Sequence, residues 1–92
     1  DLDLETWVNG ERRQASNTRN LVFDCFEQVE TLSTVCTLEP GDLVASGTPD
    51  GVGMAMDPPG FLADGDVVTV TISGIGTIAN PVIVEPDDTA LI

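Results

Sequence analysis

The sequence predicts an α+β fold that is mainly β, with one short amphipathic helix and five or six short strands. Three observations support this prediction. Apolar and polar residues alternate in residues 1–8 and again in residues 68–72, which is the period of a half-buried strand. An Asn9-Gly10 pair follows the first of these segments, and this pair favours a tight hairpin. A single segment, residues 25–36, has apolar residues at helical spacing.

The first two strands are predicted to form a hairpin. Residues 1–8 would be the outgoing strand and residues 11–16 the returning strand. Asn9-Gly10 fits the turn between them, because both central positions of a type I′ turn require a positive φ.

The helix is predicted to begin after Asp24, whose side chain would cap it together with Glu27 three residues later. Pro40 prevents its continuation. Cys25 and Cys36 both fall in this segment, about 16 Å apart at 1.5 Å per residue, which is too far for a disulfide. We therefore expect both cysteines to be reduced and buried, as is typical of a cytoplasmic protein.

Two Leu-x-x-Gly-Asp units, at residues 38–42 and 62–66, are each predicted to turn the chain into an apolar strand. The first would lead into a strand at residues 43–45 and the second into the strand at 68–72, which then turns back through residues 75–79. Residues 54–60 are expected to form a loop. Residues 85–92 lack periodicity and are expected to fray.

Composition limits the function classes. The 92 residues contain 16 acidic residues against three arginines, with no lysine or histidine, for a formal charge of −13. Nucleic acid and anionic membranes are therefore disfavoured as partners. Adaptation to high salt, which screens self-repulsion, is a hypothesis that this charge suggests. No apolar run is long enough for a membrane span. The 41% hydrophobic content is enough for one modest core.

The glycine-rich run at residues 41–53 is the first candidate for a binding site. Gly47 and Gly51 flank Thr48 and allow the backbone to approach a ligand closely. The Thr48 hydroxyl and nearby N–H groups are donors suited to an anion. The alternative is a plain Gly/Pro turn in which the Thr48 hydroxyl only caps the backbone.

The chain resembles the C-terminal part of the fumarylacetoacetate hydrolase family over about residues 4–82. The matching motifs occur in the family's order: TWVNGE at 6–11, RQ at 13–14, LEPGD at 38–42, SGTP at 46–49 with GVG at 51–53, Leu62 with GDVV at 65–68, GIGT at 74–77 and NPV at 80–82.

The resemblance implies part of a mixed β-sandwich roll or barrel, with residues 1–92 as the C-terminal segment of one catalytic domain. It implies a metal-dependent enzyme that acts on small 2-oxo or 1,3-dicarbonyl acids by C–C hydrolysis, decarboxylation or isomerisation. Examples are a 2-hydroxyhepta-2,4-diene-1,7-dioate isomerase or an acylpyruvase of aromatic catabolism. A homodimer is also implied.

The implied cofactor is Mg²⁺ or Mn²⁺, with Ca²⁺ as an alternative. The family's Glu-x-Glu pair, later Asp and catalytic Lys lie upstream of the matching region, so the metal ligands and catalytic residues are expected outside this chain. We therefore expect the isolated chain to be inactive. A non-catalytic β module for binding or scaffolding is the alternative interpretation.

Thr48, Gly47 and Gly51 are the substrate-binding residues that the resemblance implies, with Thr48 contacting the carboxylate or keto oxygens. Asp50 departs from the family pattern and would either point away from an anionic substrate or alter substrate preference. Arg13 and Gln14 are favoured for a surface or packing role over a substrate role. Asp64 and Asp66 are better explained by a Gly-Asp turn than by a cation site. Asp42 is expected to bond backbone N–H groups of its own turn.

Overall fold

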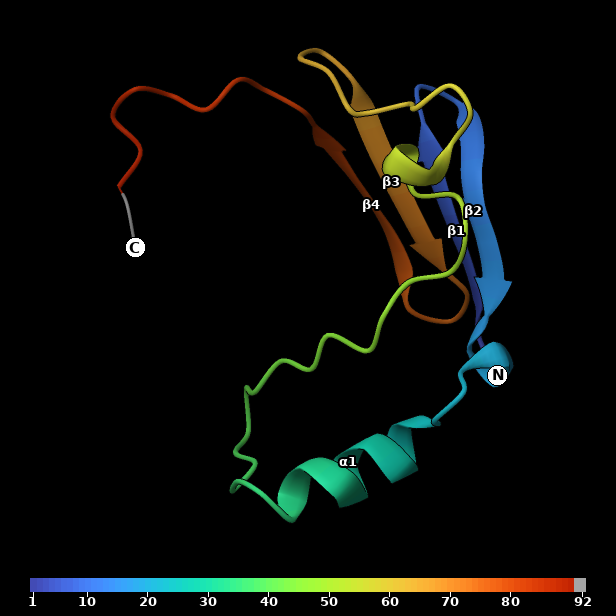
Figure 1. The fold of residues 1–92 in the computed structure, drawn as a ribbon, viewed down its shortest axis with the longest axis vertical. Coiled ribbons are helices and arrows are strands. Elements are labelled where there is room, and N and C mark those ends of the chain that lie inside the picture. Colours follow the sequence, from blue (N-terminus) through green and yellow to red (C-terminus); the bar gives the residue numbers. More distant parts are fainter. Residues whose placement is uncertain (91–92) are drawn as a thin grey trace.

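The computed structural model describes residues 1–90, and its centre is a four-stranded antiparallel sheet (Figure 1). The strands are β1 (Asp3–Val8), β2 (Glu11–Asn17), β3 (Val67–Ile72) and β4 (Gly76–Pro81), arranged in the order β2-β1-β3-β4. One α-helix, α1 (Cys25–Ser33), and two short 3₁₀ helices, η1 (Thr18–Asn20) and η2 (Gly53–Ala55), complete the fold. The predicted mainly β class with one short helix is confirmed. The sheet is open at both edges within the described residues, so these residues form no closed barrel.

The predicted hairpin is present between β1 and β2. Asn9 and Gly10 have φ values of 50° and 81°, as the expected turn requires. Asn9 also fixes the next strand, because its side chain accepts a hydrogen bond from the Val67 N–H at 2.8 Å. β1 pairs with β3 along its other edge, so residues about 60 positions apart in sequence lie side by side.

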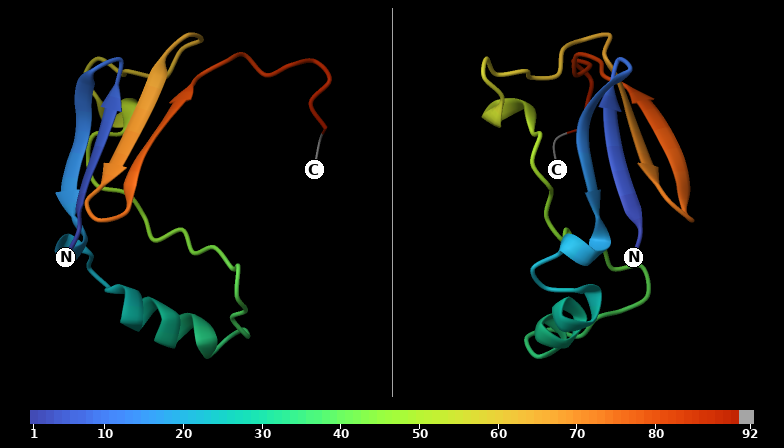
Figure 2. Two further views of the ribbon diagram at one scale, coloured as in Figure 1. Left: turned by 180° about the vertical axis from the view of Figure 1, so that it is seen from behind. Right: turned by 90° about the vertical axis from the view of Figure 1, so that its right-hand side faces the viewer.

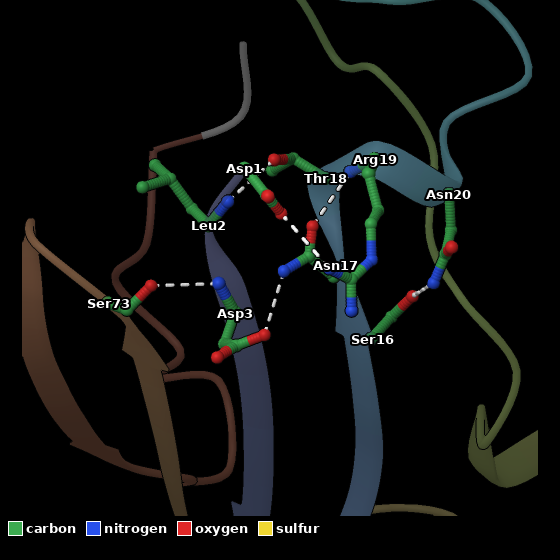
Figure 3. Close-up of polar contacts among 9 residues, drawn as sticks. All are labelled: Asp1, Leu2, Asp3, Ser16, Asn17, Thr18, Arg19, Asn20 and Ser73. Atoms are coloured by element: carbon green, nitrogen blue, oxygen red, sulfur yellow. Dashed lines mark hydrogen bonds and ion pairs between the residues drawn. The ribbon is translucent and has the colours of Figure 1, made fainter.

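The end of the sheet near the N-terminus is held by side chains that replace missing backbone partners (Figure 3). The Leu2 N–H donates to the Thr18 hydroxyl at 2.9 Å, and the Asp3 N–H donates to the Ser73 hydroxyl at 2.8 Å. The Asn17 amide donates to the Asp3 carboxylate at 2.8 Å while its oxygen caps η1. These contacts fix the point at which the chain leaves β2 for the helix.

The helix α1 begins as predicted and ends earlier. Asp24 and Glu27 form the expected capping box, with both reciprocal hydrogen bonds present. The helix stops at Ser33, where the Ser33 and Thr34 hydroxyls bond the carbonyls of Glu30 and Thr31 at 2.8 and 2.7 Å. Such local bonds compete with helix continuation.

The prediction that Cys25 and Cys36 share one helix is therefore wrong, because Cys36 lies beyond its end. The prediction that they are buried is also wrong: both thiols are free and exposed. The physical reason is that α1 lies beyond the end of the sheet, and no described element covers its apolar face (Figures 1 and 2). Phe26 on that face is 85% exposed.

Two strand predictions also differ from the structure. Residues 43–45 have no regular secondary structure and pair with no described strand, and Leu43 is 97% exposed. The described residues contain four strands, where five or six were predicted. The strands after the second Leu-x-x-Gly-Asp unit are present, as β3 and β4. Residues 85–90 contain one turn, and residues 91–92 lie outside the described residues, so the prediction that they fray is not tested.

The described residues form no compact core. The radius of gyration is 16.1 Å, against about 12 Å for a compact domain of this length. Val8 is the one buried hydrophobic residue in this part of the chain. The modest core predicted from composition is therefore absent from residues 1–90. The segment around η2 lies over one face of the sheet (Figure 2), and Val8 and Val68 of that face line the hollow beneath it. No helix in the same range is long and apolar enough to cross a bilayer.

Candidate functional site

A β-bulge in β2 aims two consecutive side chains at the segment that runs from Thr48 to Gly60. Thr6 pairs with Gln14 and Trp7 pairs with Arg12, so Arg13 is the extra residue of the bulged strand. Consecutive residues of a regular strand point to opposite faces, whereas a bulge re-aims a side chain. Here Arg13 and Gln14 both contact the segment between residues 48 and 60.

Arg13 contacts the end of this segment, at Met56 and Gly60. Its Nη1 atom donates to the Gly60 carbonyl at 3.2 Å and lies 3.0 Å from the Met56 sulfur. Its Nε lies 2.9 Å from the Glu11 carboxylate, an ion-pair distance, but is not aligned for a hydrogen bond. The Arg13 side chain is 20% exposed. These contacts give Arg13 a packing role, in agreement with the interpretation favoured from the sequence.

Gln14 bonds the start of this segment, at Thr48 and Pro49. Its Nε2 atom donates to the Thr48 hydroxyl at 2.8 Å and to the Pro49 carbonyl at 3.0 Å. The Thr48 hydroxyl also lies 3.4 Å from the Pro49 carbonyl, a long contact. Gln14 was interpreted from the sequence as a surface or packing residue, and its direct bond to Thr48 was missed. The bulge that aims Gln14 at the loop leaves no signal in the sequence pattern.

The glycines of the loop differ in whether a neighbouring backbone atom lies close to them. Gly51 has φ +100°, and a Cβ added there would overlap the Arg13 carbonyl oxygen and lie 2.9 Å from its carbon. Gly47 has φ +109° but faces open space. Gly51 is therefore required for the close approach of the loop to β2, whereas Gly47 is required for backbone conformation alone. Gly53 is a further close approach, because a Cβ there would overlap the Gly60 carbonyl.

Thr48 lies where two hollows meet. One, of about 480 Å³, lies between the loop and the end of β2 and is lined in part by Ser16, Thr18 and Gly47. The other, of about 470 Å³, lies over the apolar face of the sheet beside Val8 and Gly51. Both volumes are within the range of small-molecule sites, about 300–1,000 Å³. The structure therefore places Thr48 beside two open surface hollows, with Gly47 lining the first and Gly51 the second.

Asp50 is exposed and lines neither hollow. From the sequence, Asp50 was expected either to point away from an anionic substrate or to alter substrate preference. Its position agrees with the first of these. An anionic ligand beside Thr48 would therefore not meet the Asp50 carboxylate at the cavity wall.

The carboxylates of the two Leu-x-x-Gly-Asp units close their own turns. Asp42 accepts a hydrogen bond from the Glu39 N–H at 2.8 Å, and Asp66 accepts one from the Ala63 N–H at 2.9 Å. The Ala63 N–H, followed by the Asn9 side chain, lowers the pKa of Asp66 below its ordinary value of 3.8. Both acids are occupied by turn formation, as the sequence interpretation held.

A divalent metal does not fit the residues that the structure describes. No group of three or more acidic, cysteine or histidine side chains in residues 1–90 could hold an ion. Hard divalent cations need several oxygen ligands, and no aspartate or glutamate of the described residues lines either hollow. Metal ligation therefore cannot come from this part of the chain alone.

Comparison with known proteins shows which protein family the chain is similar to. The family model described as "Fumarylacetoacetate (FAA) hydrolase C-terminal" matches residues 1–83. The chain is 48% identical over 81 residues to the oxaloacetate tautomerase YisK of Bacillus subtilis, covering 88% of this chain and 27% of that protein.

Solved structures agree. A fumarylacetoacetate hydrolase from Exiguobacterium antarcticum is 46% identical with a TM-score of 0.88, over 92% of this chain and 31% of that one. A maleylpyruvate hydrolase from Sphingobium sp. SYK-6, solved with manganese(II) and pyruvate, is 44% identical with a TM-score of 0.79, over 89% and 28%. The chain thus spans about a third or less of the length of these relatives. On the family match over residues 1–83, the chain belongs to the fumarylacetoacetate hydrolase family of enzymes.

Proposed function

We propose that this chain forms the Thr48-bearing wall of the substrate site in an enzyme that acts on small 2-oxo or 1,3-dicarbonyl acids. Residues 1–92 would be the C-terminal segment of a single catalytic domain. The observation that carries the proposal is the position of Thr48, whose hydroxyl is fixed by Gln14 at the junction of two ligand-sized hollows. Family membership favours this enzyme over the non-catalytic β module.

The chemistry of Thr48 suits such substrates. A 2-oxo acid presents a carboxylate and an adjacent keto oxygen, and negative charge develops on the keto oxygen when an enolate forms. A hydroxyl donor positioned beforehand stabilises that charge without reorganising in the transition state. Gly51 would contribute by letting the segment that carries Thr48 approach β2 closely, and Gly47 by allowing the positive φ beside Thr48.

Tautomerisation and isomerisation are the reactions that we propose first, with C–C hydrolysis and decarboxylation as related outcomes of the same enolate chemistry. The tautomerase activity named for the Bacillus subtilis relative supports this order. The hydrolase names of the two structural relatives support the wider reaction class.

We further propose that the full-length enzyme uses Mg²⁺ or Mn²⁺, with Ca²⁺ as the alternative, and that its ligands lie outside residues 1–92. The manganese in the maleylpyruvate hydrolase structure supports this. A cytoplasmic homodimer completes the proposal. The free thiols of Cys25 and Cys36 support the compartment, and exposed apolar side chains on α1 and β4 are surfaces that an assembly could cover.

The proposal is tested by assaying the full-length enzyme against a panel of small 2-oxo acids, including oxaloacetate and maleylpyruvate. Chelation with EDTA is expected to abolish turnover, and Mn²⁺ or Mg²⁺ is expected to restore it. Monocarboxylates without the keto group serve as control substrates and should not be turned over. Full activity after chelation would contradict the metal proposal, and no activity on any 2-oxo or 1,3-dicarbonyl acid would contradict the substrate class.

A further inference from the structure

The Gln14 side-chain amide makes two hydrogen bonds that together define which of its atoms faces the loop. One terminal atom lies 3.0 Å from the Pro49 carbonyl oxygen and 2.8 Å from the Thr48 hydroxyl oxygen. A carbonyl oxygen can only accept, so the facing atom must be the NH₂ nitrogen. Both of its hydrogens are then in use, one on Pro49 and one on Thr48.

This arrangement determines how the Thr48 hydroxyl can act. Because its oxygen accepts a hydrogen from Gln14, its own hydrogen remains free to be donated. Within the loop, the acceptor available to that hydrogen is the Pro49 carbonyl oxygen, 3.4 Å from the hydroxyl oxygen. This distance is well beyond the roughly 2.7–2.8 Å that is usual between the oxygens of a hydroxyl hydrogen bond. A ligand oxygen at normal distance would therefore displace this contact at little cost.

We propose that Gln14 is a positioning residue that sets the Thr48 hydroxyl as a donor toward an anionic oxygen of the substrate. Gln14 itself does not touch the substrate. It acts by occupying the acceptor side of the hydroxyl and by holding the Pro49 carbonyl in place. This inference rests on the proposed function, because it assigns Gln14 a role only through Thr48.

The loop has other anchors, so the role of Gln14 can be separated from folding. Arg13 bonds the Gly60 carbonyl, and Gly51 packs directly against the Arg13 backbone. Removing the Gln14 amide leaves both of these contacts intact. Its loss should therefore disturb the orientation of the Thr48 hydroxyl more than the position of the loop.

The test is a double-mutant cycle in the full-length enzyme with Mn²⁺, using the best 2-oxo acid from the substrate panel. Gln14→Met keeps the length of the side chain and removes both donors. We expect it to lower kcat/KM by about tenfold, equivalent to about 1.4 kcal/mol. In a Thr48→Val background the same substitution should lower kcat/KM by less than about twofold, because the hydroxyl on which Gln14 acts is gone.

Two further variants control for side effects. Asn80→Leu removes a side-chain amide from β4, outside both hollows, and it should leave kcat/KM unchanged. Gln14→Glu keeps the size of the side chain but presents an acceptor, so the Thr48 hydroxyl would donate to it and turn from the substrate. We expect Gln14→Glu to impair turnover at least as much as Gln14→Met, and it takes the place of Gln14→Met in the cycle if that variant does not fold.

The outcomes separate this inference from the function on which it rests. If Thr48→Val retains full activity, the proposed function fails, whatever Gln14 does. If Thr48→Val is impaired but the Gln14 substitution costs the same factor in both backgrounds, only the positioning role is overturned. A lowered melting temperature with unchanged kcat/KM in the Gln14 variants would also overturn the positioning role, because Gln14 would then only anchor the loop.

Discussion

Gly51→Ala in the full-length enzyme is expected to lower the melting temperature much more than Gly41→Ala. The two glycines have similar φ values, +100° and +96°, so an alanine meets similar backbone strain at each, about 1–3 kcal/mol. Only at Gly51 does the added Cβ also overlap a backbone atom, the Arg13 carbonyl oxygen. Forcing an extra carbon into a packed contact adds typically about 1–3 kcal/mol more.

Gly41 is the matched control because nothing lies within 4 Å of a Cβ added there. Thermal unfolding of both variants measures the difference. Each 1 kcal/mol corresponds to about 2–4 °C for a domain of 150–250 residues. Equal shifts for the two variants would show that the loop does not approach β2 as closely in the full-length enzyme as it does here.

Thr48→Val is expected to reduce kcat/KM by roughly 10- to 150-fold while leaving the fold intact. The substitution keeps side-chain volume and removes one hydrogen bond to an anionic group, which is worth about 1.5–3 kcal/mol, and each 1.36 kcal/mol is about tenfold in rate. Steady-state kinetics of the full-length enzyme, with circular dichroism to check folding, provide the measurement.

Thr71→Val is the matched control for this substitution. The Thr71 hydroxyl bonds the Thr77 hydroxyl at 2.9 Å between β3 and β4, and Thr71 lines neither hollow. The Thr71→Val variant loses one hydroxyl from the sheet and should keep a normal kcat/KM. The opposite pattern at Thr48, a lowered melting temperature with near-normal kcat/KM, would reduce it to a turn-capping residue.

Local signals in the sequence predicted local structure well. Asn9-Gly10 required positive φ values and has them, and the Asp24–Glu27 capping box is formed. The alternation in residues 68–72 corresponds to β3. In each case the residues that determine the structure are neighbours in sequence, so no distant partner is needed.

Features that depend on distant partners were predicted poorly. The run at residues 43–45 has strand-like composition but pairs with no described strand, and strand propensity depends on such pairing and packing. Cys25 was expected to be buried because it lies among apolar residues at helical spacing, yet no described element covers that face. Burial is a property of the whole fold, and these residues are a third or less of the length of their relatives.

The candidate site shows the same division. Thr48 and the flanking glycines could be singled out from the sequence because their motif is continuous. The bond from Gln14 to Thr48 spans 34 positions and depends on the bulge at Arg13. A bulge is a property of strand register, which the sequence of β2 alone does not reveal.

A crystal structure of the full-length enzyme with manganese and pyruvate would show whether the Thr48 hydroxyl faces the substrate. These are the ligands present in the maleylpyruvate hydrolase structure. The predicted result is a hydrogen bond from the Thr48 hydroxyl to a pyruvate oxygen at about 2.5–3.0 Å, with Gln14 still bonded to Thr48. Pyruvate bound in the site without a hydrogen bond to the Thr48 hydroxyl would contradict a substrate-binding role for Thr48.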